Sequence, residues 1–145
     1  MSDVLTLSQI RMPGTARSKD AAIREAGGIL VDAGAVDPAY IDSMFDRERS
    51  VSTYMGNYLA IPHGTNESKE SIKRSALSVV RYPEPIDWDG NEVLFALGIA
   101  GYQGGHMDIL SRIALVFSDT DEVDKLVAAR SAQEIFDLLN AVNEE

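Results

Sequence analysis

The two histidines of the chain are the side chains best suited to covalent chemistry. His63 lies in the tetrapeptide Pro62-His63-Gly64-Thr65, and His106 follows two consecutive glycines. Each loop comes after an apolar segment typical of a strand, and functional sites of α/β sheets gather at strand ends. A neutral imidazole, whose pKa is ordinarily about 6.5, is a competent nucleophile near neutral pH and can form a covalent intermediate. Phosphohistidine chemistry is therefore reasonable at either residue.

Other chemistries need residues that the sequence does not supply. Two histidines offer too few metal ligands unless carboxylates join them, and neither a His-x-x-x-His nor a Glu-x-x-His pairing occurs. The chain has no cysteine and no G-x-S-x-G nucleophile elbow. The stretch Gly101–Gly105 lacks the lysine of a phosphate-binding loop and the spacing of a dinucleotide-binding loop. We therefore expect no metal and no cofactor. A binding module with inert histidines remains an alternative.

Composition favours one globular domain spanning residues 1–145, because 45% of the residues are hydrophobic and 25% are charged. A net charge of -10 argues against nucleic-acid binding and suits a partner with a basic face. No secretion signal is recognisable, and the apolar runs are far shorter than the about 20 residues that cross a bilayer. We therefore expect a cytoplasmic protein without a transmembrane segment.

The first half of the chain contains one expected strand and two expected helices. Alternating apolar residues predict a strand over Leu5 to Met12, which a Pro-Gly pair ends. Apolar residues at three- and four-residue spacing predict a helix over Lys19 to Ala33, with Ser18 as its N-cap. A second helix should begin at the capping carboxylate of Asp37 and end near residues 47–50.

The first histidine should lie in a constrained loop after a short strand. A turn at Gly56-Asn57 precedes the apolar segment Tyr58 to Ile61, which predicts that strand. Pro62 fixes its own φ and biases the preceding residue to an extended conformation, while Gly64 permits close approach of the backbone to a ligand.

The second half of the chain alternates strands and helices. Strands are expected over Ala76 to Tyr82 and Val93 to Ile99, joined by a proline-rich connection, and neither alternates cleanly, so both faces should be covered. Helical periods follow from Met107 and over Asp119 to Ala129, and Ser131 with Glu134 forms a capping box for a last helix. We predict an α/β fold with a mixed β-sheet covered by helices on both faces.

A longer set of motifs resembles a known family. The segments are Asp46-Arg47-Glu48, Thr53-Tyr54-Met55-Gly56-Asn57, Ala60-Ile61-Pro62-His63-Gly64-Thr65 and Gly105-His106-Met107-Asp108-Ile109-Leu110. Together they are similar to the active-site segments of mannitol/fructose-type enzyme IIA domains of sugar phosphotransferase systems. The resemblance extends over nearly the whole chain and is greatest to the mannitol branch.

The resemblance implies a phosphotransferase component that relays a phosphoryl group between proteins. His63 matches the residue that accepts the group from phospho-HPr and passes it to enzyme IIB. His106 matches the second active-site histidine, although a place at a helix N-terminus would also explain it. Arg47 matches the arginine that stabilises phosphoryl charge, which suits a guanidinium fork, and the neighbouring Arg49 is an alternative for that contact.

Three further residues are expected to support the phosphoryl site. Thr53 and Asn57 match polar positions that would orient it, although both residue types also occur simply as turn residues. Some relatives carry a carboxylate where Asn57 stands, so a role that needs negative charge is in doubt. Backbone amides near Gly64 would contact the phosphoryl oxygens.

Donor and acceptor must reach the same nitrogen, so a single docking face should serve both proteins. Met55, Tyr58 and Tyr102 are candidates for exposed contacts on that face, and the same residues would also suit the core. The sugar is chosen by the membrane component. A regulatory phosphocarrier of the same fold, of the nitrogen type, is an alternative function.

Overall fold

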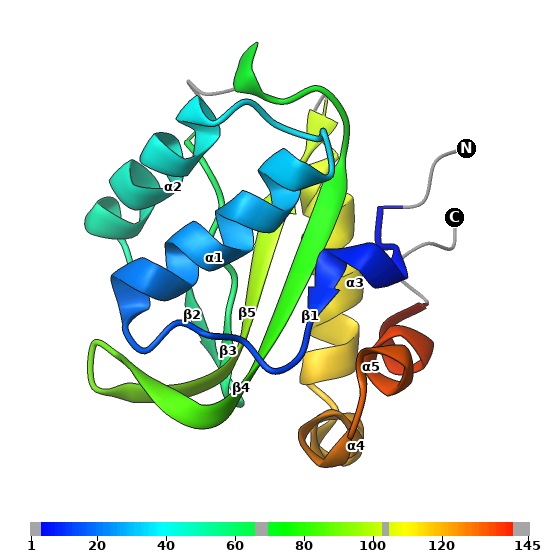
Figure 1. Cartoon of the computed structure of the whole chain (residues 1–145). Helices are drawn as coiled ribbons and strands as arrows, with labels where there is room; N and C mark the ends of the chain where they lie inside the picture. The colour runs from blue at the N-terminus through cyan, green and yellow to red at the C-terminus, as the bar shows by residue number, and fades with distance from the viewer. Residues whose placement is uncertain (1–3, 66–69, 103–104, 141–145) are drawn as a thin grey trace.

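One mixed sheet organises the chain in this computed structural model, which describes residues 4–65, 70–102 and 105–140. Within these ranges the sheet has five strands in the order β1-β4-β5-β3-β2 (Figure 1). β1 pairs parallel with β4 and β3 pairs parallel with β5, while the β4–β5 and β2–β3 pairs are antiparallel. The strands are β1 (Ile10–Arg11), β2 (Tyr54–Gly56), β3 (Leu59–Ala60), β4 (Ala76–Trp88) and β5 (Asn91–Ala100).

Helices cover both faces of this sheet, as the sequence predicts. α1 lies across one face with α2 beside it, and α3, α4 and α5 lie on the other face (Figure 1). The helices are η1 (Leu7–Gln9, a 3-10 turn), α1 (Lys19–Asp32), α2 (Ala39–Ser50), α3 (His106–Phe117), α4 (Thr120–Ala128) and α5 (Ala132–Leu139). No helix within the described ranges is both long enough and apolar enough to cross a bilayer.

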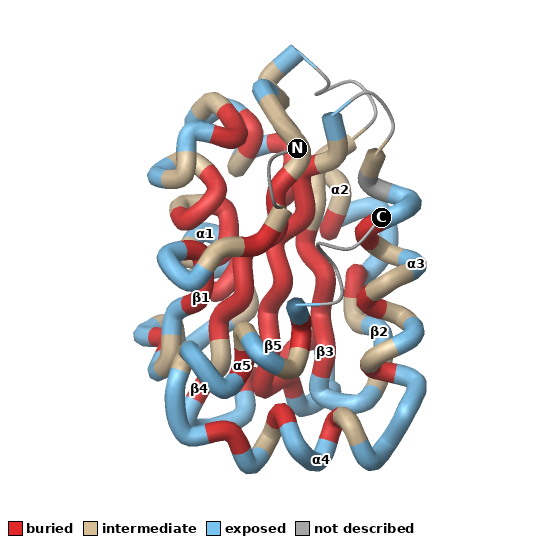
Figure 2. Tube along the Cα trace, turned by 90° about the vertical axis from the view of Figure 1, so that its right-hand side faces the viewer, coloured by how far each residue is buried: buried red, intermediate tan, exposed pale blue. Residues whose placement is uncertain are grey.

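β5 is buried on both faces, which explains why its sequence does not alternate (Figure 2). Large side chains of β5, such as Phe95, Leu97 and Ile99, pack towards α3, α4 and α5. Small residues face α1, and a Cβ atom on Gly98 would lie 3.1 Å from the carbonyl oxygen of Ala26 in that helix. The small residues therefore let α1 approach the sheet closely.

Two of the predicted helix starts are confirmed. Ser18 caps α1 by accepting from the Ala21 N–H at 3.2 Å. Ser131 accepts from the Glu134 N–H at 3.1 Å, and the Glu134 carboxylate accepts from the N–H of Arg130, one residue before the position that a standard capping box uses. Each cap satisfies an amide that the helix itself leaves without a partner.

The predicted cap at Asp37 is wrong. α2 begins at Ala39 with Pro38 at the N-cap, and no side chain caps it. The Asp37 carboxylate instead pairs with the Lys73 ammonium at 3.2 Å. Asp37 contributes to the helix start only through its carbonyl oxygen, which accepts from the Tyr40 N–H at 2.9 Å.

The strand predicted over Leu5 to Met12 is wrong for most of its length. Residues 7–9 form the 3-10 turn η1, and only two residues pair as β1. The cause is the buried Gln9 side chain, which donates to the carbonyl oxygens of Val4 and Leu77 at 2.9 and 2.7 Å. A side-chain amide thus takes the place of ladder hydrogen bonds.

The proline-rich connection expected after Tyr82 is strand. β4 continues through Pro83 and Pro85 to Trp88, with a register shift between Arg81 and Ile86. β1 pairs only with residues 79 and 80, so beyond them β4 has β5 as its ladder partner and the missing proline N–H is tolerated.

The hairpin before His63 also differs from the prediction. β2 was not foreseen, and Tyr58, expected in a strand, has a φ of 68° beside Asn57 with a φ of 51°. These two residues form the turn between β2 and β3. The Tyr58 carbonyl oxygen accepts from the N–H groups of Leu94 and Phe95, which fixes the turn against β5.

Candidate active site

His63 lies at the end of the sheet where β5 finishes. Two residues separate it from the end of β3, and it forms an isolated parallel bridge with Ile99. The Ile99 N–H donates to the Pro62 carbonyl oxygen at 3.1 Å, so the tripeptide is anchored to a central strand. The histidine itself is half-buried. The sequence therefore placed this residue correctly at a strand end.

The His63 ring has a defined tautomer. Its Nδ1 lies 2.7 Å from the carbonyl oxygen of Ile61. A carbonyl oxygen only accepts, so Nδ1 carries the proton and donates it. In the neutral ring the nucleophilic lone pair then resides on Nε2.

Tyr40 of α2 is a site residue that no sequence motif marks. Its buried hydroxyl donates to the Ile99 carbonyl oxygen at 2.7 Å and accepts from the Gly64 N–H at 2.8 Å. Burial raises the pKa of this hydroxyl above its ordinary value, although the hydrogen bond from Gly64 acts the other way. Tyr40 thus fixes the backbone just after His63. A buried tyrosine that must find a hydrogen-bond partner was the available clue.

Gly64 anchors the loop that carries His63. The sequence predicts that backbone amides near Gly64 contact the phosphoryl oxygens, and the Gly64 N–H itself donates to the Tyr40 hydroxyl at 2.8 Å. This residue therefore supports the site by holding the loop in place.

Arg47 and Arg49 lie on different sides of α2. Arg47 follows Tyr40 by seven residues, so at about 100° per residue both lie on one helix face. Its Nη1 donates to the Val51 carbonyl oxygen at 2.9 Å, which uses one of the five N–H donors of the guanidinium. Arg49 lies on the opposite side and pairs with Asp46 at 2.6 Å on the surface. Geometry therefore favours Arg47 over Arg49 as the arginine nearer to His63.

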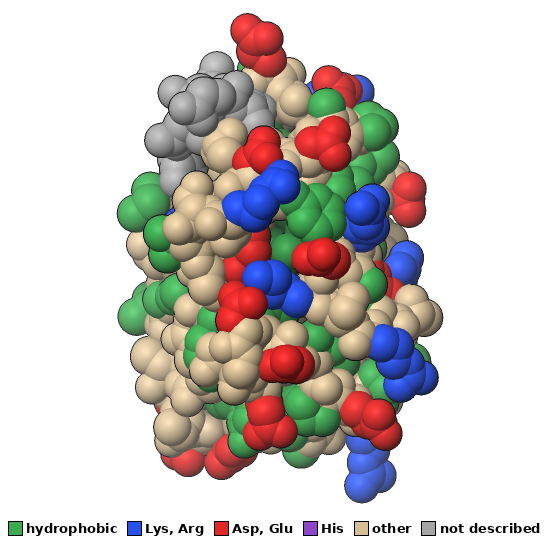
Figure 3. Space-filling model, turned by 90° about the vertical axis from the view of Figure 1, so that its left-hand side faces the viewer, with side chains coloured by type: hydrophobic (Ala, Val, Ile, Leu, Met, Phe, Trp, Pro, Cys, Tyr) green, Lys and Arg blue, Asp and Glu red, His purple; other side chains and the backbone are tan. Residues whose placement is uncertain are grey.

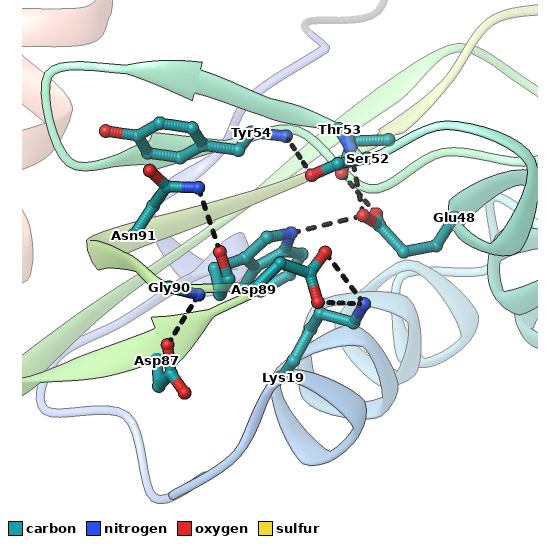
Figure 4. A network of polar contacts seen from close by, with 10 residues as sticks. Lys19, Glu48, Ser52, Thr53, Tyr54, Asp87, Asp89, Gly90 and Asn91 are labelled. Carbon is teal, nitrogen blue, oxygen red and sulfur yellow. Dashed lines mark hydrogen bonds and ion pairs between the residues drawn. The ribbon is translucent and has the colours of Figure 1, made fainter.

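Thr53 is 4% exposed and directed inward. Its N–H and its hydroxyl both donate to the Glu48 carboxylate (Figure 4), and its carbonyl oxygen accepts from the Ile61 N–H at 3.0 Å. The side chain thus makes no surface for a ligand. Any contribution of Thr53 to the site is indirect.

His106 is the first residue of α3, so its backbone lies at the same end of the sheet as His63. The preceding Gly105 lies against Ser75, whose hydroxyl accepts from the Tyr102 N–H at 2.9 Å. Ser75 directly precedes the Ala76–Ala100 pair that closes the β4–β5 ladder. The imidazole of His106 lies outside the described part of the structure. The N-terminus of a helix is nonetheless favourable for an anion.

Asn57 does not lie with the other site residues. Its side-chain amide donates to the carbonyl oxygen of Phe117 at 2.7 Å, at the C-terminal end of α3. His106 begins the same helix, so the two residues flank its opposite ends. Asn57 also precedes β3, whereas His63 follows it, so β3 lies between the two residues in the chain. The Asn57 amide therefore joins the β2–β3 turn to α3, and its expected role in orienting the phosphoryl site stays a prediction.

The apolar residues proposed as docking contacts are exposed. Met55, Tyr58 and Tyr102 are 50%, 41% and 46% exposed, so the alternative of core positions is excluded. Two more exposed apolar residues, Val51 and Met107, follow α2 and begin α3. By contrast, acidic and basic side chains intermingle over the face that α1 and α2 form (Figure 3).

Comparison with known proteins gives consistent results at three levels. Residues 3–142 match the family described as phosphoenolpyruvate-dependent sugar phosphotransferase system, EIIA 2. A mannitol-specific phosphotransferase enzyme IIA component from Halalkalibacterium halodurans is 50% identical over 141 residues, covering 97% of each chain.

Two solved structures are also similar to this chain. In the complex of mannitol enzyme IIA with phosphorylated enzyme IIB from Escherichia coli, the IIA fold matches with a TM-score of 0.88 and 29% identity over 94% of this chain and 97% of that chain. The crystal structure of mannitol IIA from Escherichia coli gives a TM-score of 0.86 and 30% identity over 93% of this chain and 98% of that chain.

Proposed function

Because the chain belongs to the EIIA 2 family of the phosphoenolpyruvate-dependent sugar phosphotransferase system, we propose that it carries a phosphoryl group on His63 from phospho-HPr to enzyme IIB of a mannitol transporter. The observation that carries the assignment to His63 is the hydrogen bond from Nδ1 to the Ile61 carbonyl oxygen, which directs the lone pair to Nε2. Family membership makes the protein a phosphotransferase component that acts between proteins.

The transfer step follows from this tautomer. Nε2 of His63 attacks the phosphorus of phospho-HPr, and the bond between phosphorus and the donor nitrogen breaks as the new one forms. Nδ1 keeps its proton, so positive charge develops on the ring. The Ile61 carbonyl oxygen, at 2.7 Å, stabilises that charge and prevents the ring from turning. Passage of the group to enzyme IIB reverses these events.

Arg47 and His106 are the proposed partners of the phosphoryl oxygens. Phosphoryl transfer needs mainly positioning and charge stabilisation, because negative charge spreads over three equatorial oxygens. A guanidinium fork provides paired donors, and the start of α3 adds the partial positive charge of a helix N-terminus. Thr53 and Gly64 contribute indirectly, because their hydrogen bonds hold the backbone near His63 in place.

The proposal of mannitol as the sugar and of enzyme IIB as the acceptor rests on the related proteins. The curated relative is named mannitol-specific, and the structural relative is bound to phosphorylated enzyme IIB. Exposed apolar side chains suit brief docking of successive partners, and the net charge of -10 suits partners with basic faces. Phosphoryl groups that originate from phosphoenolpyruvate are met in the cytoplasm, which is therefore the proposed location.

Intact-mass spectrometry tests the assignment of the acceptor. The protein is incubated with phosphoenolpyruvate, enzyme I and HPr, beside His63→Ala and His106→Ala. Wild type should gain one acid-labile phosphoryl group, His63→Ala none, and His106→Ala the group at a lower rate. No gain in wild type with a competent HPr would refute the proposal.

Transfer onward separates transport from regulation. Phosphorylated protein is mixed with a mannitol enzyme IIB, and the loss of phosphoryl from one mass with its gain by the other is followed. A sugar-transport component should pass the group on. Retention of the group would favour the regulatory phosphocarrier.

A further inference from the structure

Glu48 is a buried carboxylate directly after the proposed phosphoryl ligand Arg47. It is 6% exposed. Three donors surround it: the Thr53 N–H at 2.9 Å, the Thr53 hydroxyl, and the indole N–H of Trp88 at 3.2 Å (Figure 4). All three are uncharged, and Trp88 is itself fully buried.

Packing alone does not account for this carboxylate. Removing a carboxylate from water is costly, and an apolar side chain of similar volume commonly fills such a position as well or better. An apolar residue would not form the hydrogen bonds that hold Thr53 in one orientation. The three hydrogen bonds fix Thr53 at two of its atoms and attach it to both α2 and β4.

Thr53 leads directly to the phosphoryl acceptor. Its carbonyl oxygen accepts from the Ile61 N–H at 3.0 Å, and the Ile61 carbonyl oxygen accepts from Nδ1 of His63 at 2.7 Å. Glu48 is therefore joined to the imidazole through two backbone positions.

The segment that contains Thr53 also accepts a hydrogen bond from Arg47. Arg47 donates to the carbonyl oxygen of Val51 at 2.9 Å, and Val51 lies two residues before Thr53. The short stretch 51–53 is thus bonded directly to Arg47 and is joined to His63 through Ile61.

We propose that Glu48 is a positioning residue, which acts through Thr53 to fix the Arg47 guanidinium relative to the His63 imidazole and to keep the Nδ1–H tautomer in place. This inference rests on the proposed role of His63. Glu48 touches neither donor nor acceptor protein in this account. Its effect is on geometry, and displacement by about 1 Å at such a distance can slow a reaction about 100-fold.

A matched pair of substitutions tests the proposal. Thr53→Val removes the hydroxyl that donates to buried Glu48. Tyr82→Phe removes the hydroxyl that donates to Glu25 at 2.9 Å, a bond that is not part of the chain of bonds from Glu48 to His63. Rapid-quench measurement of transfer from phospho-HPr gives the kcat and the KM of each variant.

The expected result is specific to Thr53→Val. Its kcat should fall about 10-fold or more with the KM for phospho-HPr unchanged, because the reacting groups are misplaced while docking is not. Tyr82→Phe should keep both constants although its melting temperature falls. Thr53→Ser, which restores the hydroxyl, should recover the rate. Equal rates in Thr53→Val and wild type, or equal losses in Thr53→Val and Tyr82→Phe, would overturn the proposal.

Nitrogen-15 NMR of the His63 ring adds a readout that needs no transfer. Wild type should show a protonated Nδ1, and Thr53→Val should show an increased fraction of the Nε2–H tautomer, with Tyr82→Phe like wild type. An unchanged tautomer together with an unchanged kcat contradicts the positioning role. Failure of wild type to accept phosphoryl at all refutes the proposed function instead, so the two failures are distinguishable.

Glu48→Gln supplies a second variant in case Thr53→Val does not fold. Glutamine keeps one oxygen for the Thr53 N–H and the Trp88 N–H, and its amide can donate to the Thr53 hydroxyl. Positioning predicts a kcat within about threefold of wild type, because the hydrogen bonds persist. A kcat loss of 10-fold or more with an unchanged tautomer would overturn the proposal, since the charge itself would then be acting.

Discussion

Two buried carboxylates on α1 and α2 are used in opposite ways. The Glu25 side chain is 5% exposed and receives donors from Arg11, Thr15, Ala16 and Tyr82. Its donors include a cation, whereas those of Glu48 are all uncharged. Burial would raise the pKa of Glu25, but the hydrogen bonds from Thr15 and Ala16 and the Arg11 guanidinium lower it to about 2.

The partners of each carboxylate indicate what it does. Glu25 joins α1 to the loop after β1 and to β4, away from both histidines. Glu48 joins α2 to the segment that leads to His63. We therefore expect Glu25 to contribute mainly to the free energy of unfolding. We expect Glu48, which is joined to His63 through Thr53 and Ile61, to contribute mainly to the geometry of the site.

Removing the first carboxylate should have the largest effect on stability. Glu25→Ala leaves an arginine, two backbone amides and two hydroxyls without this acceptor, so we expect the free energy of unfolding to fall by about 3 kcal/mol. Urea denaturation at neutral pH measures this fall. The folded variant should still be phosphorylated to one group per chain. A loss of phosphorylation in folded Glu25→Ala would contradict the claim that Glu25 acts on stability and not on the site.

Acid should weaken the Glu25 network. The pKa of Glu25 is about 2 when folded against an ordinary value of 4.5, so its stabilising contribution is present above pH 4.5 and is lost as the pH falls towards 2. The stability difference between wild type and Glu25→Gln should shrink by about 2 kcal/mol over that range. Urea titrations at several pH values measure the difference. A difference that does not change with pH would contradict the assignment.

Tyr40→Phe should affect stability and rate together. The buried hydroxyl joins the Gly64 N–H of the His63 loop to the Ile99 carbonyl oxygen of β5. Its loss should therefore lower the free energy of unfolding by about 1.5 kcal/mol. Phosphoryl transfer should also slow, because the backbone after His63 is released. Tyr82→Phe is the control, since it should cost a similar amount without slowing transfer.

Substitutions of Arg47 and Arg49 should have the smallest effects on stability, and their effects on the transfer rate should differ. Arg49→Lys changes an exposed ion pair with Asp46 and should alter the free energy of unfolding by less than about 0.5 kcal/mol, with an unchanged transfer rate. Arg47→Lys should slow transfer several-fold at nearly unchanged stability, because an ammonium lacks the planar fork. Rates that respond to Arg49→Lys and not to Arg47→Lys would reverse the assignment.

Local patterns in the sequence predicted the parts of the fold that depend on local physics. Ser18 and Ser131 cap helices through bonds to residues three positions away, so their spacing is visible in the sequence. From Val93 onward β5 has no polar side chain, because both its faces are covered there, and the lack of alternation in the sequence already indicates this. The proline and glycine around His63 likewise marked a constrained loop after a strand.

Contacts between distant residues were not predictable in this way. Gln9 replaces ladder bonds by reaching Leu77, which shortened an expected strand. Pro83 and Pro85 lie in β4 only because β1 ends before them. Asn57 matches a site position of the family motif, and its amide bonds to Phe117 in α3. Tyr40 belongs to no motif and Glu48 occurs only as the last residue of the segment Asp46-Arg47-Glu48, so their roles appear only once α2 is packed beside the His63 loop.

The most direct test of the central claim is NMR of the phosphorylated protein with nitrogen-15 in its histidine rings, read together with its phosphorus spectrum. Nδ1 of His63 donates to a carbonyl oxygen, so the account predicts a phosphorus–nitrogen coupling at Nε2 of His63 with a proton retained on Nδ1. Phosphorus bonded to Nδ1, or to a nitrogen of His106, would contradict it.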